Sequence, residues 1–264
     1  MSLNDWIQGQ AVRGKISFSV EDVRGVFSCR SEESLKTELR RLASSNRIQQ
    51  VYKGFYVIVP VQYQLKAVVP PTYYINELMT YLRKPYYVGL LSAAAIHGAA
   101  HQRAMTTQVV TIAPRSRVSG NPLLDWNYRQ RIPSELLLTK NAEMGTIKYS
   151  NPELTAVDLV QFATNIGGYQ RAATVLAELV DEVNIGKMEA VLPYTTTASL
   201  QRFGFLLEEV LLEQEKADQL YLLLRKNKPF FNDALLSTAH SANNHTKRNR
   251  WRVDKNIDIE IDDL

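Results

Sequence analysis

The sequence predicts an α+β protein in which an N-terminal winged helix-turn-helix precedes a mixed α/β domain, made of a small sheet and a helical layer. Residues 16–59 contain two short helical patterns followed by two strand patterns. Runs rich in β-branched residues then occur up to residue 150, and leucines at helical spacing follow from residue 152. We therefore expect a DNA-binding domain at 1–62, a second domain at 71–240 and a polar extended tail at 241–264.

Two short helices are predicted before residue 28. Residues 3–12 form an opening helical pattern. Ser19 is a suitable N-cap for a helix over Val20–Phe27, because its side-chain oxygen can accept a backbone N–H of the first turn. Residues 15–19 are expected to form a brief strand that pairs with the later hairpin.

The helix that follows Ser31, its expected N-cap, has an apolar face and a polar face. Leucines at spacings of four and three line the apolar face, at positions 35, 39 and 42. The other face, with the turn before it, carries cationic and hydroxyl groups that can reach phosphates and base edges. The predicted DNA-contacting residues of this segment are Arg30, Ser34, Lys36, Thr37, Arg40 and Arg41.

A β-hairpin is predicted after this polar-faced helix. Alternating apolar residues from Ile48 to Val59 indicate two strands, and Gly54 provides the positive φ that a tight turn requires. Tyr52 and Lys53 lie at the tip and are expected to contact the DNA backbone. A winged helix-turn-helix places its second helix in the major groove and its hairpin on the neighbouring backbone, so double-stranded DNA is the expected partner. A solvated surface helix beside an ordinary hairpin is the alternative interpretation.

The second domain is expected to begin after Pro70 and Pro71, since neither proline can continue a helix or a strand ladder. Helices are predicted at 72–83 and 86–99, and the second of them is apolar nearly all round, with a small sheet packed on it. The strands of that sheet are expected at 108–113, 123–128, 136–138 and 145–149. Further helices are expected at 152–164, 169–184, 187–192, 195–214 and 216–226, and a last strand at 257–261.

The charge distribution favours a polyanion as partner. Residues 1–150 hold 19 Lys and Arg against 10 Asp and Glu, whereas residues 151–239 hold 7 against 12. A basic region binds nucleic acid through neutralised phosphates and released counterions. Five tyrosines at 73–87 are interpreted as core and interface residues, and a platform for stacking single-stranded bases is the alternative. The lone Cys29, the lack of a secretory signal and the lack of an apolar run of ~20 residues favour a cytoplasmic protein.

Catalytic and metal-binding signatures are not found in the sequence. No GxxxxGK, GxSxG or CxxC pattern occurs. His97 and His101 are four residues apart and would share a helical face, but no third ligand is evident. The expected sheet offers only Asp125, Glu135 and Glu143 for metal-dependent nuclease chemistry. We therefore expect no enzymatic activity, no cofactor and no metal site.

Two sequence blocks, together with the predicted winged helix, resemble the AbiEi antitoxins of bacterial abortive-infection toxin–antitoxin systems. The first block is an aromatic pair followed by Leu-Ser-Ala-Ala and His-Gly. The second is a Ser-Pro-Glu-x-Thr start to an Asp-containing helix, in which Asn151 intrudes and Leu154 replaces the usual basic residue. The matching residues are Tyr86, Tyr87, Leu91, Ser92, Ala93, Ala94, His97 and Gly98 in the first block and Ser150, Pro152, Glu153, Thr155 and Asp158 in the second.

The resemblance implies a transcriptional regulator and antitoxin that acts in phage defence. Its N-terminal domain would bind inverted repeats in the operator of its own operon and repress it. Its second domain would counter a nucleotidyltransferase toxin, and in type IV systems the antitoxin need not bind the toxin directly. The residues leave two other classes open: a nuclease or transferase with a winged-helix specificity domain, and a non-catalytic protein-binding adaptor. They also leave open whether the chain is a monomer or a homodimer.

Overall fold

The structure of the 264-residue chain is a computed structural model, and it describes residues 1–65, 68–99, 105–113, 122–142, 145–227, 230–241 and 249–261. These residues contain both helices and sheets, which confirms the predicted α+β class. The chain divides into two compact units, and neither is one continuous stretch. The first comprises 1–86, 105–130 and 139–148, and the second comprises 87–104, 131–138 and 149–264. The predicted domain boundaries remain predictions.

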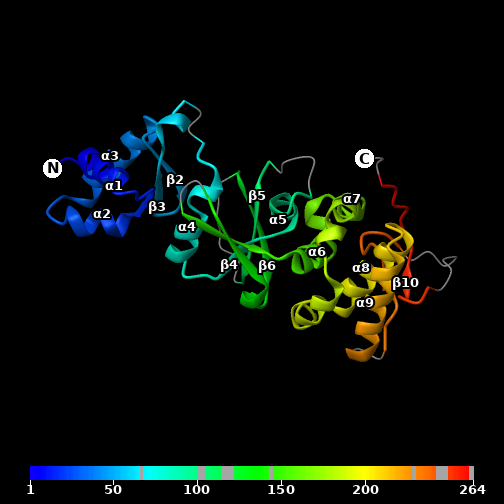
Figure 1. The fold of residues 1–264 in the computed structure, drawn as a ribbon. Helices are drawn as coiled ribbons and strands as arrows, with labels where there is room; N and C mark the ends of the chain where they lie inside the picture. Colours follow the sequence, from blue (N-terminus) through cyan, green and yellow to red (C-terminus); the bar gives the residue numbers. More distant parts are fainter. Residues whose placement is uncertain are drawn as a thin grey trace. The chain divides into compact units, whose positions relative to one another are not determined.

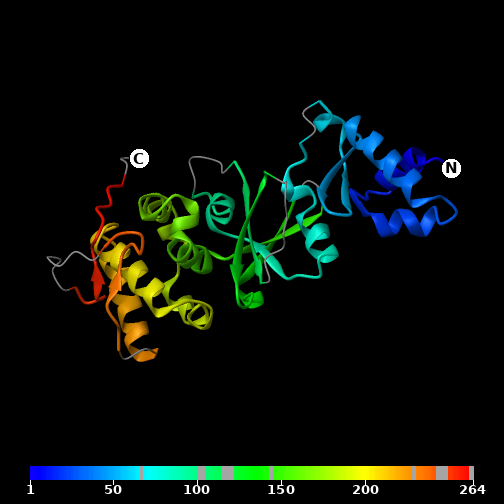
Figure 2. The same cartoon turned by 180° about the vertical axis from the view of Figure 1, so that it is seen from behind.

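Residues 1–59, in the first unit, form three helices and a three-stranded antiparallel sheet. Their order is α1 (Leu3–Val12), β1 (Ser17–Ser19), α2 (Val20–Val26), α3 (Glu32–Ser44), β2 (Ile48–Tyr52) and β3 (Phe55–Ile58). β3 lies in the middle, paired with β1 on one side and β2 on the other, and the hairpin strands lie side by side in both ribbon views (Figure 1, Figure 2). The predicted helices, the brief strand and the hairpin are confirmed at these positions.

Serine caps determine where α2 and α3 begin. The Ser19 hydroxyl accepts a hydrogen bond from the Asp22 N–H, and the Asp22 carboxylate accepts the Ser19 N–H in return. This reciprocal pair is a capping box, which satisfies two backbone donors that the helix would otherwise leave open. The Ser31 hydroxyl accepts the N–H of Ser34 in the same way. Both predicted caps are confirmed.

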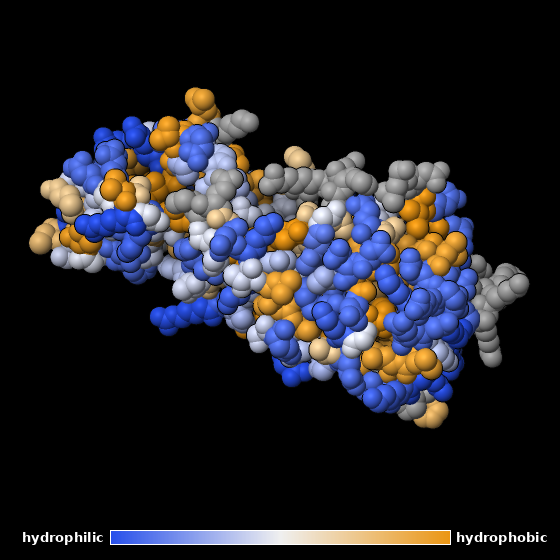
Figure 3. All heavy atoms as spheres, in the orientation of Figure 1, coloured by the Kyte–Doolittle hydropathy of each residue, from blue (hydrophilic) through white to orange (hydrophobic). Residues whose placement is uncertain are grey.

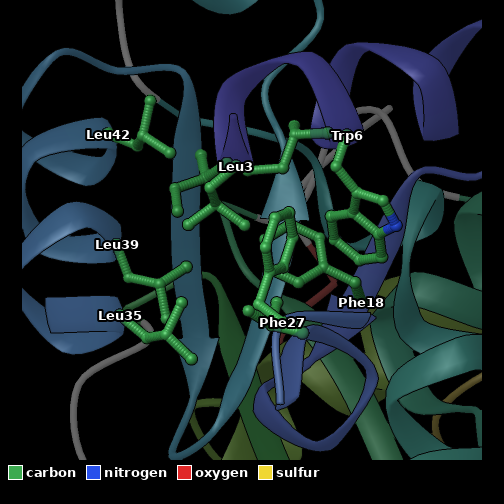
Figure 4. Close-up of a cluster of buried hydrophobic side chains, with 10 residues drawn as sticks. Leu3, Trp6, Phe18, Phe27, Leu35, Leu39 and Leu42 are labelled. Atoms are coloured by element: carbon green, nitrogen blue, oxygen red, sulfur yellow. The ribbon is translucent and has the colours of Figure 1, made fainter. Parts of the chain in front are cut away.

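The core of residues 1–59 lies between α3 and the two preceding helices. The leucine stripe of α3 is buried, with exposed fractions of 5% or less. Its three side chains point toward the aromatic residues of α1, β1 and the end of α2 (Figure 4). Trp6 makes edge-on contacts with Phe18 and Phe27, at centroid distances of 5.5 and 6.3 Å. Because the stripe faces this core, the polar face of α3 faces solvent.

The segment after the hairpin differs from the predicted helix at 72–83. A 3₁₀ turn at η2 (Pro71–Tyr73) comes first, and α4 is limited to Ile75–Tyr81. Tyr74, whose φ and ψ of −134° and −4° are not helical, separates the two. Arg83 adopts a positive φ of 52° and therefore ends the helix. The predicted start of the helix at residue 72 is thus wrong, because the helix begins three residues later.

A five-stranded sheet has the order β6-β5-β4-β8-β7. Its strands are β4 (Tyr86–Val88), β5 (Thr107–Ile112), β6 (Leu124–Arg129), β7 (Leu137–Asn141) and β8 (Thr146–Ser150). β5 and β6 run parallel, and so do β4 and β8. The four predicted strands are confirmed with small shifts of their ends, whereas β4 is a strand that the sequence analysis assigned to a helix.

The predicted helix at 86–99 is wrong at both ends. Its first three residues form β4, and α5 spans only Leu90–Ile96. A fully buried apolar run fits either period, and the aromatic and β-branched residues at its start favour a strand. Gly98 then adopts a left-handed φ of 89° just after the helix. The shared helical face assumed for His97 and His101 is therefore wrong for His97, which caps the helix, and His101 lies outside the described residues.

Four longer helices belong to the second unit. They are α6 (Pro152–Gln161), α7 (Tyr169–Leu179), α8 (Thr197–Glu209) and α9 (Gln214–Asn227). α6 packs against α5, α7 and α8, and α8 packs against α9. The helix predicted at 187–192 is a 3₁₀ helix, η6 (Ile185–Ala190).

The strand predicted at 257–261 is also wrong. The C-terminal strand is β10 (Val253–Asp254), which pairs in parallel with β9 (Ala234–Leu235). Isoleucine alternation at 257–261 is present, but Glu260 bonds with its main chain to the side chain of Gln170 instead of a neighbouring strand. Alternation describes which residues share a face, and it does not supply a strand to pair with.

Four of the five tyrosines at 73–87 are core residues, as expected, and Tyr81 is half-buried. Tyr73, Tyr74, Tyr86 and Tyr87 are all 4% exposed or less. Burial raises the pKa of Tyr86 to about 12, so its hydroxyl stays protonated over the physiological range. Rings this deeply buried cannot stack on nucleic-acid bases.

The polarity of the surface and of the helices bears on whether the chain could span a membrane. Hydrophilic and hydrophobic residues are interspersed over the face seen in Figure 3. Within the described segments, no helix combines the length and apolarity needed to cross a membrane.

The burial of the Glu77 carboxyl on α4 can be tested through the pH dependence of the free energy of unfolding. Its burial raises the pKa of the carboxyl, so the folded state favours the protonated form. That stabilisation is complete below the pKa of the unfolded chain and is lost as pH rises through the raised folded pKa. We expect Glu77→Gln to be more stable than the wild type at pH 7, with the difference vanishing near pH 4, in urea unfolding series. Glu189→Gln, at an exposed position, is the control. A Glu77→Gln difference that did not change with pH would contradict the assignment.

Candidate functional site: a nucleic-acid interface

The predicted DNA-contacting residues lie on α3, on the turn before it and on the hairpin tip. The polar face of α3 positions five of them, because the leucine stripe orients the helix. Arg30 lies in the turn, and the other two lie at the end of β2 and in the turn that follows it. Seven of the eight are exposed, and the exception is Tyr52, which is half-buried.

Carboxylates of α3 itself pair with three of these cations. Lys36 Nζ lies 3.0 Å from Glu32, and Arg30 and Arg41 lie 2.7 and 3.9 Å from Glu38. The hydrogen bond from Lys36 is the largest cause that lowers the pKa of Glu32. Exposed ion pairs contribute little to stability, so a phosphate can compete for Lys36. Glu38 is more protected, since its side chain is only 14% exposed.

Arg40 and Lys53 differ from the other cations of the interface. Both side chains are exposed, and within the described residues neither has a carboxylate at ion-pair distance. The charge of Arg40 acts on Tyr56 of β3, where it opposes the rise in pKa that burial causes. These two cations are therefore the best placed to meet phosphates, one from the helix and one from the hairpin. Sequence reasoning treated all the cations alike, because it could not place the carboxylates.

The hairpin tip is in contact with α4, which sequence reasoning did not include in the interface. The Tyr81 hydroxyl donates a hydrogen bond to the main-chain oxygen of Lys53 at 3.4 Å. The Tyr81 ring packs on Phe55 and, edge-on, on Tyr52, at centroid distances of 5.1 and 6.4 Å. Gly54 has the predicted positive φ, of 76°, and a Cβ there would lie 3.0 Å from the Tyr81 hydroxyl. A separation of 28 residues leaves no periodic signal by which sequence could join these groups.

The two sequence blocks shared with AbiEi antitoxins meet in the second unit. The Tyr87 hydroxyl, from β4, donates to Asp158 Oδ2 of α6 at 2.7 Å, and both residues are fully buried. His97 Nε2 lies 2.8 Å from the main-chain oxygen of Ser150, and the Ser150 and Thr155 hydroxyls are 2.6 Å apart. These bonds join β4 to α6, and the end of α5 to the end of β8, which the Ser150 and Thr155 hydroxyls connect to α6. A buried polar network of this kind specifies one packing arrangement.

Further residues of the second block hold the start of α6. The Asn151 side chain accepts the N–H of Leu154 at 2.9 Å, with Pro152 at the first helical position. Glu153 Oε1 accepts the N–H of Asn184 at 3.1 Å. Leu154, at the position where the resemblance implies a basic residue, is fully buried. The intruding Asn151 is thus a helix cap, and position 154 belongs to the core.

The geometry of this network is that of a structural element. Asp158 is fully buried and bonded to Tyr87, so no substrate reaches its carboxylate. Across the described parts of the chain, no three His, Cys, Asp or Glu side chains gather closely enough to hold a metal ion. Glu143 and His101 lie outside those parts.

The region that contains the buried network matches a known protein family. Residues 87–209 match the family model described as the AbiEi antitoxin C-terminal domain. The chain carries an AbiEi antitoxin domain. This confirms the predicted resemblance, and it supports a role as the antitoxin of a toxin–antitoxin system. The matched region begins at Tyr87 and includes Asp158, so the buried hydrogen bond lies inside the AbiEi domain.

The fold is also similar to that of a solved structure, the RV2827C protein from Mycobacterium tuberculosis. The TM-score is 0.68 at 16% identity, and the alignment covers 94% of this chain and 88% of that one. At this identity the similarity concerns the fold alone. A search of curated proteins found no match. Residues 1–86 precede the match to the AbiEi domain, so the interface on α3 and the hairpin rests on its own geometry.

Proposed function

We propose that the chain is a cytoplasmic, non-enzymatic antitoxin that also represses its own operon. Residues 1–59 act as a winged helix-turn-helix that binds inverted repeats in the operator, and the AbiEi domain counters a nucleotidyltransferase toxin. The observation that supports DNA binding best is the exposed polar face of α3, which directly precedes the hairpin of β2 and β3. The three-stranded order β1-β3-β2 agrees with this assignment.

Docking follows from the placement of the side chains. α3 enters the major groove, where Ser34 and Thr37 on its outer face reach base edges. Arg40, further along the helix, and Lys53, on the hairpin, bind phosphates. Phosphates displace Glu32 from Lys36, since both side chains of that pair are more than half exposed. The protected pair of Arg30 with Glu38 is retained and orients the turn before α3.

Arg40→Ala tests DNA binding most directly. We expect an affinity for the gene's own upstream DNA about tenfold lower and a salt slope smaller by about one, because one phosphate contact is lost. The measurement is a fluorescence-anisotropy titration at two salt concentrations, with scrambled DNA as competitor. Lys187→Ala is the control, because it removes one exposed cation from η6 in the second unit and should change neither quantity.

Two outcomes would contradict the docking. If the wild-type chain bound upstream and scrambled DNA equally, operator recognition would be wrong. If it bound selectively and Arg40→Ala matched Lys187→Ala in affinity and salt slope, the placement of α3 would be wrong. Incubation of the pure protein with Mg²⁺ and nucleic acid would expose a nuclease or transferase activity and contradict the non-enzymatic assignment.

The antitoxin half of the proposal rests on the AbiEi domain and has a separate test. Co-expression with a nucleotidyltransferase encoded in the same operon should restore growth, and it should do so for Arg40→Ala as well. The reason is that the α3 interface lies in residues 1–59, outside the matched domain. Growth that stayed arrested with the wild-type chain would contradict the antitoxin role against that toxin.

A further inference from the structure

The hairpin tip is held by two contacts that come from different parts of the first unit. On the main chain, the Val20 N–H at the start of α2 donates to the Gly54 oxygen at 2.9 Å. From α4, Tyr81 donates to the Lys53 oxygen and places its ring on Phe55. Both carbonyl oxygens of the turn therefore have a partner outside the hairpin.

Neither contact uses the side chain of Lys53. The Tyr81 hydroxyl bonds to the main-chain oxygen, and the Lys53 side chain remains exposed. Tyr52 is different, because its ring is half-buried and in edge-on contact with Tyr81. The tip thus presents one cation, Lys53, to solvent, while contacts with Tyr81 and Val20 hold its main chain.

We propose that Tyr81 is a positioning residue that holds the hairpin tip so that Lys53 meets the DNA backbone. This inference rests on the proposed DNA binding and extends it to a residue outside the predicted domain at 1–62. Turns are more mobile than the strands that they connect, so packing on another element helps the tip to keep one orientation. A tip that is ordered before binding loses less conformational entropy when it meets its partner.

The close fit of Gly54 supports the same role for Tyr81. A side chain at position 54 would lie 3.0 Å from the Tyr81 hydroxyl and would also need a strained positive φ. Gly54 therefore serves two purposes, the tight turn and the close approach of Tyr81. Burial and, to a smaller extent, the negative charge of Glu21 raise the pKa of the Tyr81 hydroxyl, so it remains a hydrogen-bond donor.

The test is a double-mutant cycle on the full-length chain with the upstream DNA as ligand. We expect Tyr81→Ala to lower the affinity about fivefold in the wild-type background and in the Arg40→Ala background. In the Lys53→Ala background the loss should be less than about twofold, because the residue that Tyr81 positions is already gone. Tyr81→Phe keeps the ring contacts and should retain most of the affinity.

Hydrogen exchange at residues 53–55 provides a reading that does not depend on DNA. We expect faster amide exchange at these positions in Tyr81→Ala, and little change in Tyr81→Phe. A loss of affinity that was the same in the Lys53→Ala and Arg40→Ala backgrounds would overturn the inference, since general destabilisation acts on both. Selective wild-type binding with no effect of Tyr81→Ala would overturn the inference alone. Absence of selective binding by the wild type would overturn the proposed function and the inference together.

Discussion

Trp251→Ala is expected to lower the free energy of unfolding of the second unit by about 3–5 kcal/mol, the usual cost of emptying a large aromatic site. Trp251 is fully buried. Its ring stacks on Phe231 at 6.5 Å and meets Tyr221 edge-on at 5.4 Å, and its indole N–H donates to Glu208. The substitution therefore leaves a cavity and also removes one of the hydrogen-bond donors of the Glu208 carboxylate, which Arg250 contacts as well. Urea unfolding followed by circular dichroism provides the measurement.

Gly204 of α8 provides a second test of how Trp251 is packed. A Cβ at position 204 would lie 2.2 Å from the Trp251 ring, so the indole packs directly on the helix backbone. Alanine normally stabilises a helix interior by about 0.5–1 kcal/mol relative to glycine. Here we expect Gly204→Ala to destabilise the wild-type chain by about 1–3 kcal/mol, because the ring must shift.

The sign of the Gly204→Ala effect should reverse when the indole is absent. In the Trp251→Ala background the added methyl group enters empty space, so it should be neutral or stabilising. Gly9→Ala is a matched control, since a Cβ there has no neighbour within 4 Å. If Gly204→Ala destabilised both backgrounds equally, the close packing of Trp251 on α8 would be wrong.

Asp158→Ala is expected to destabilise the AbiEi domain by about 2–4 kcal/mol. The Tyr87 hydroxyl, 2.7 Å away and fully buried, loses the carboxylate to which it donates, and losing a hydrogen bond at a buried polar group is costly. Asp158→Asn keeps an acceptor oxygen and should cost about 1 kcal/mol. Tyr169→Phe is the control, because Tyr169 is a buried residue and no hydrogen bond of its hydroxyl to another described residue is found. Chemical unfolding of the four proteins gives the comparison.

A growth-rescue assay separates stability from chemistry at the same position. If Asp158 is structural, Asp158→Asn should still protect cells against the toxin, in proportion to the folded protein present. Asp158→Ala should fail at the temperature at which it unfolds and recover on cooling. A folded Asp158→Asn protein that gave no protection would indicate that the carboxylate itself acts in antitoxicity.

Local sequence predicts residues 1–59 well, because the signals there are short-range. The serine caps of α2 and α3 lie three residues from the N–H groups that they bind. The leucine stripe repeats within one helix, and Gly54 determines a two-residue turn. Each signal acts within one element, so it does not depend on what that element packs against.

Prediction was poorer where the outcome depends on a partner from elsewhere. The run at 86–99 is apolar on nearly every side, and only the pairing of β4 with β8 decides that its start is a strand. The alternation at 257–261 has no strand beside it, so Val253 and Asp254 pair instead. Two blocks of sequence carry the resemblance to AbiEi antitoxins, whereas only the fold brings Tyr87 of one block into contact with Asp158 of the other.

By itself, the sequence determined the α+β class, the caps and hairpin of residues 1–59, the polar face of α3 and the AbiEi family of the second domain. Only the tertiary structure distinguished Arg40 and Lys53 from the cations that form ion pairs with Glu32 and Glu38. Only the tertiary structure brought Tyr81 to the hairpin tip and Trp251 onto Gly204. The physical reason is that periodicity and capping act over a few residues, whereas ion pairing and close packing depend on distances in space that local sequence does not specify.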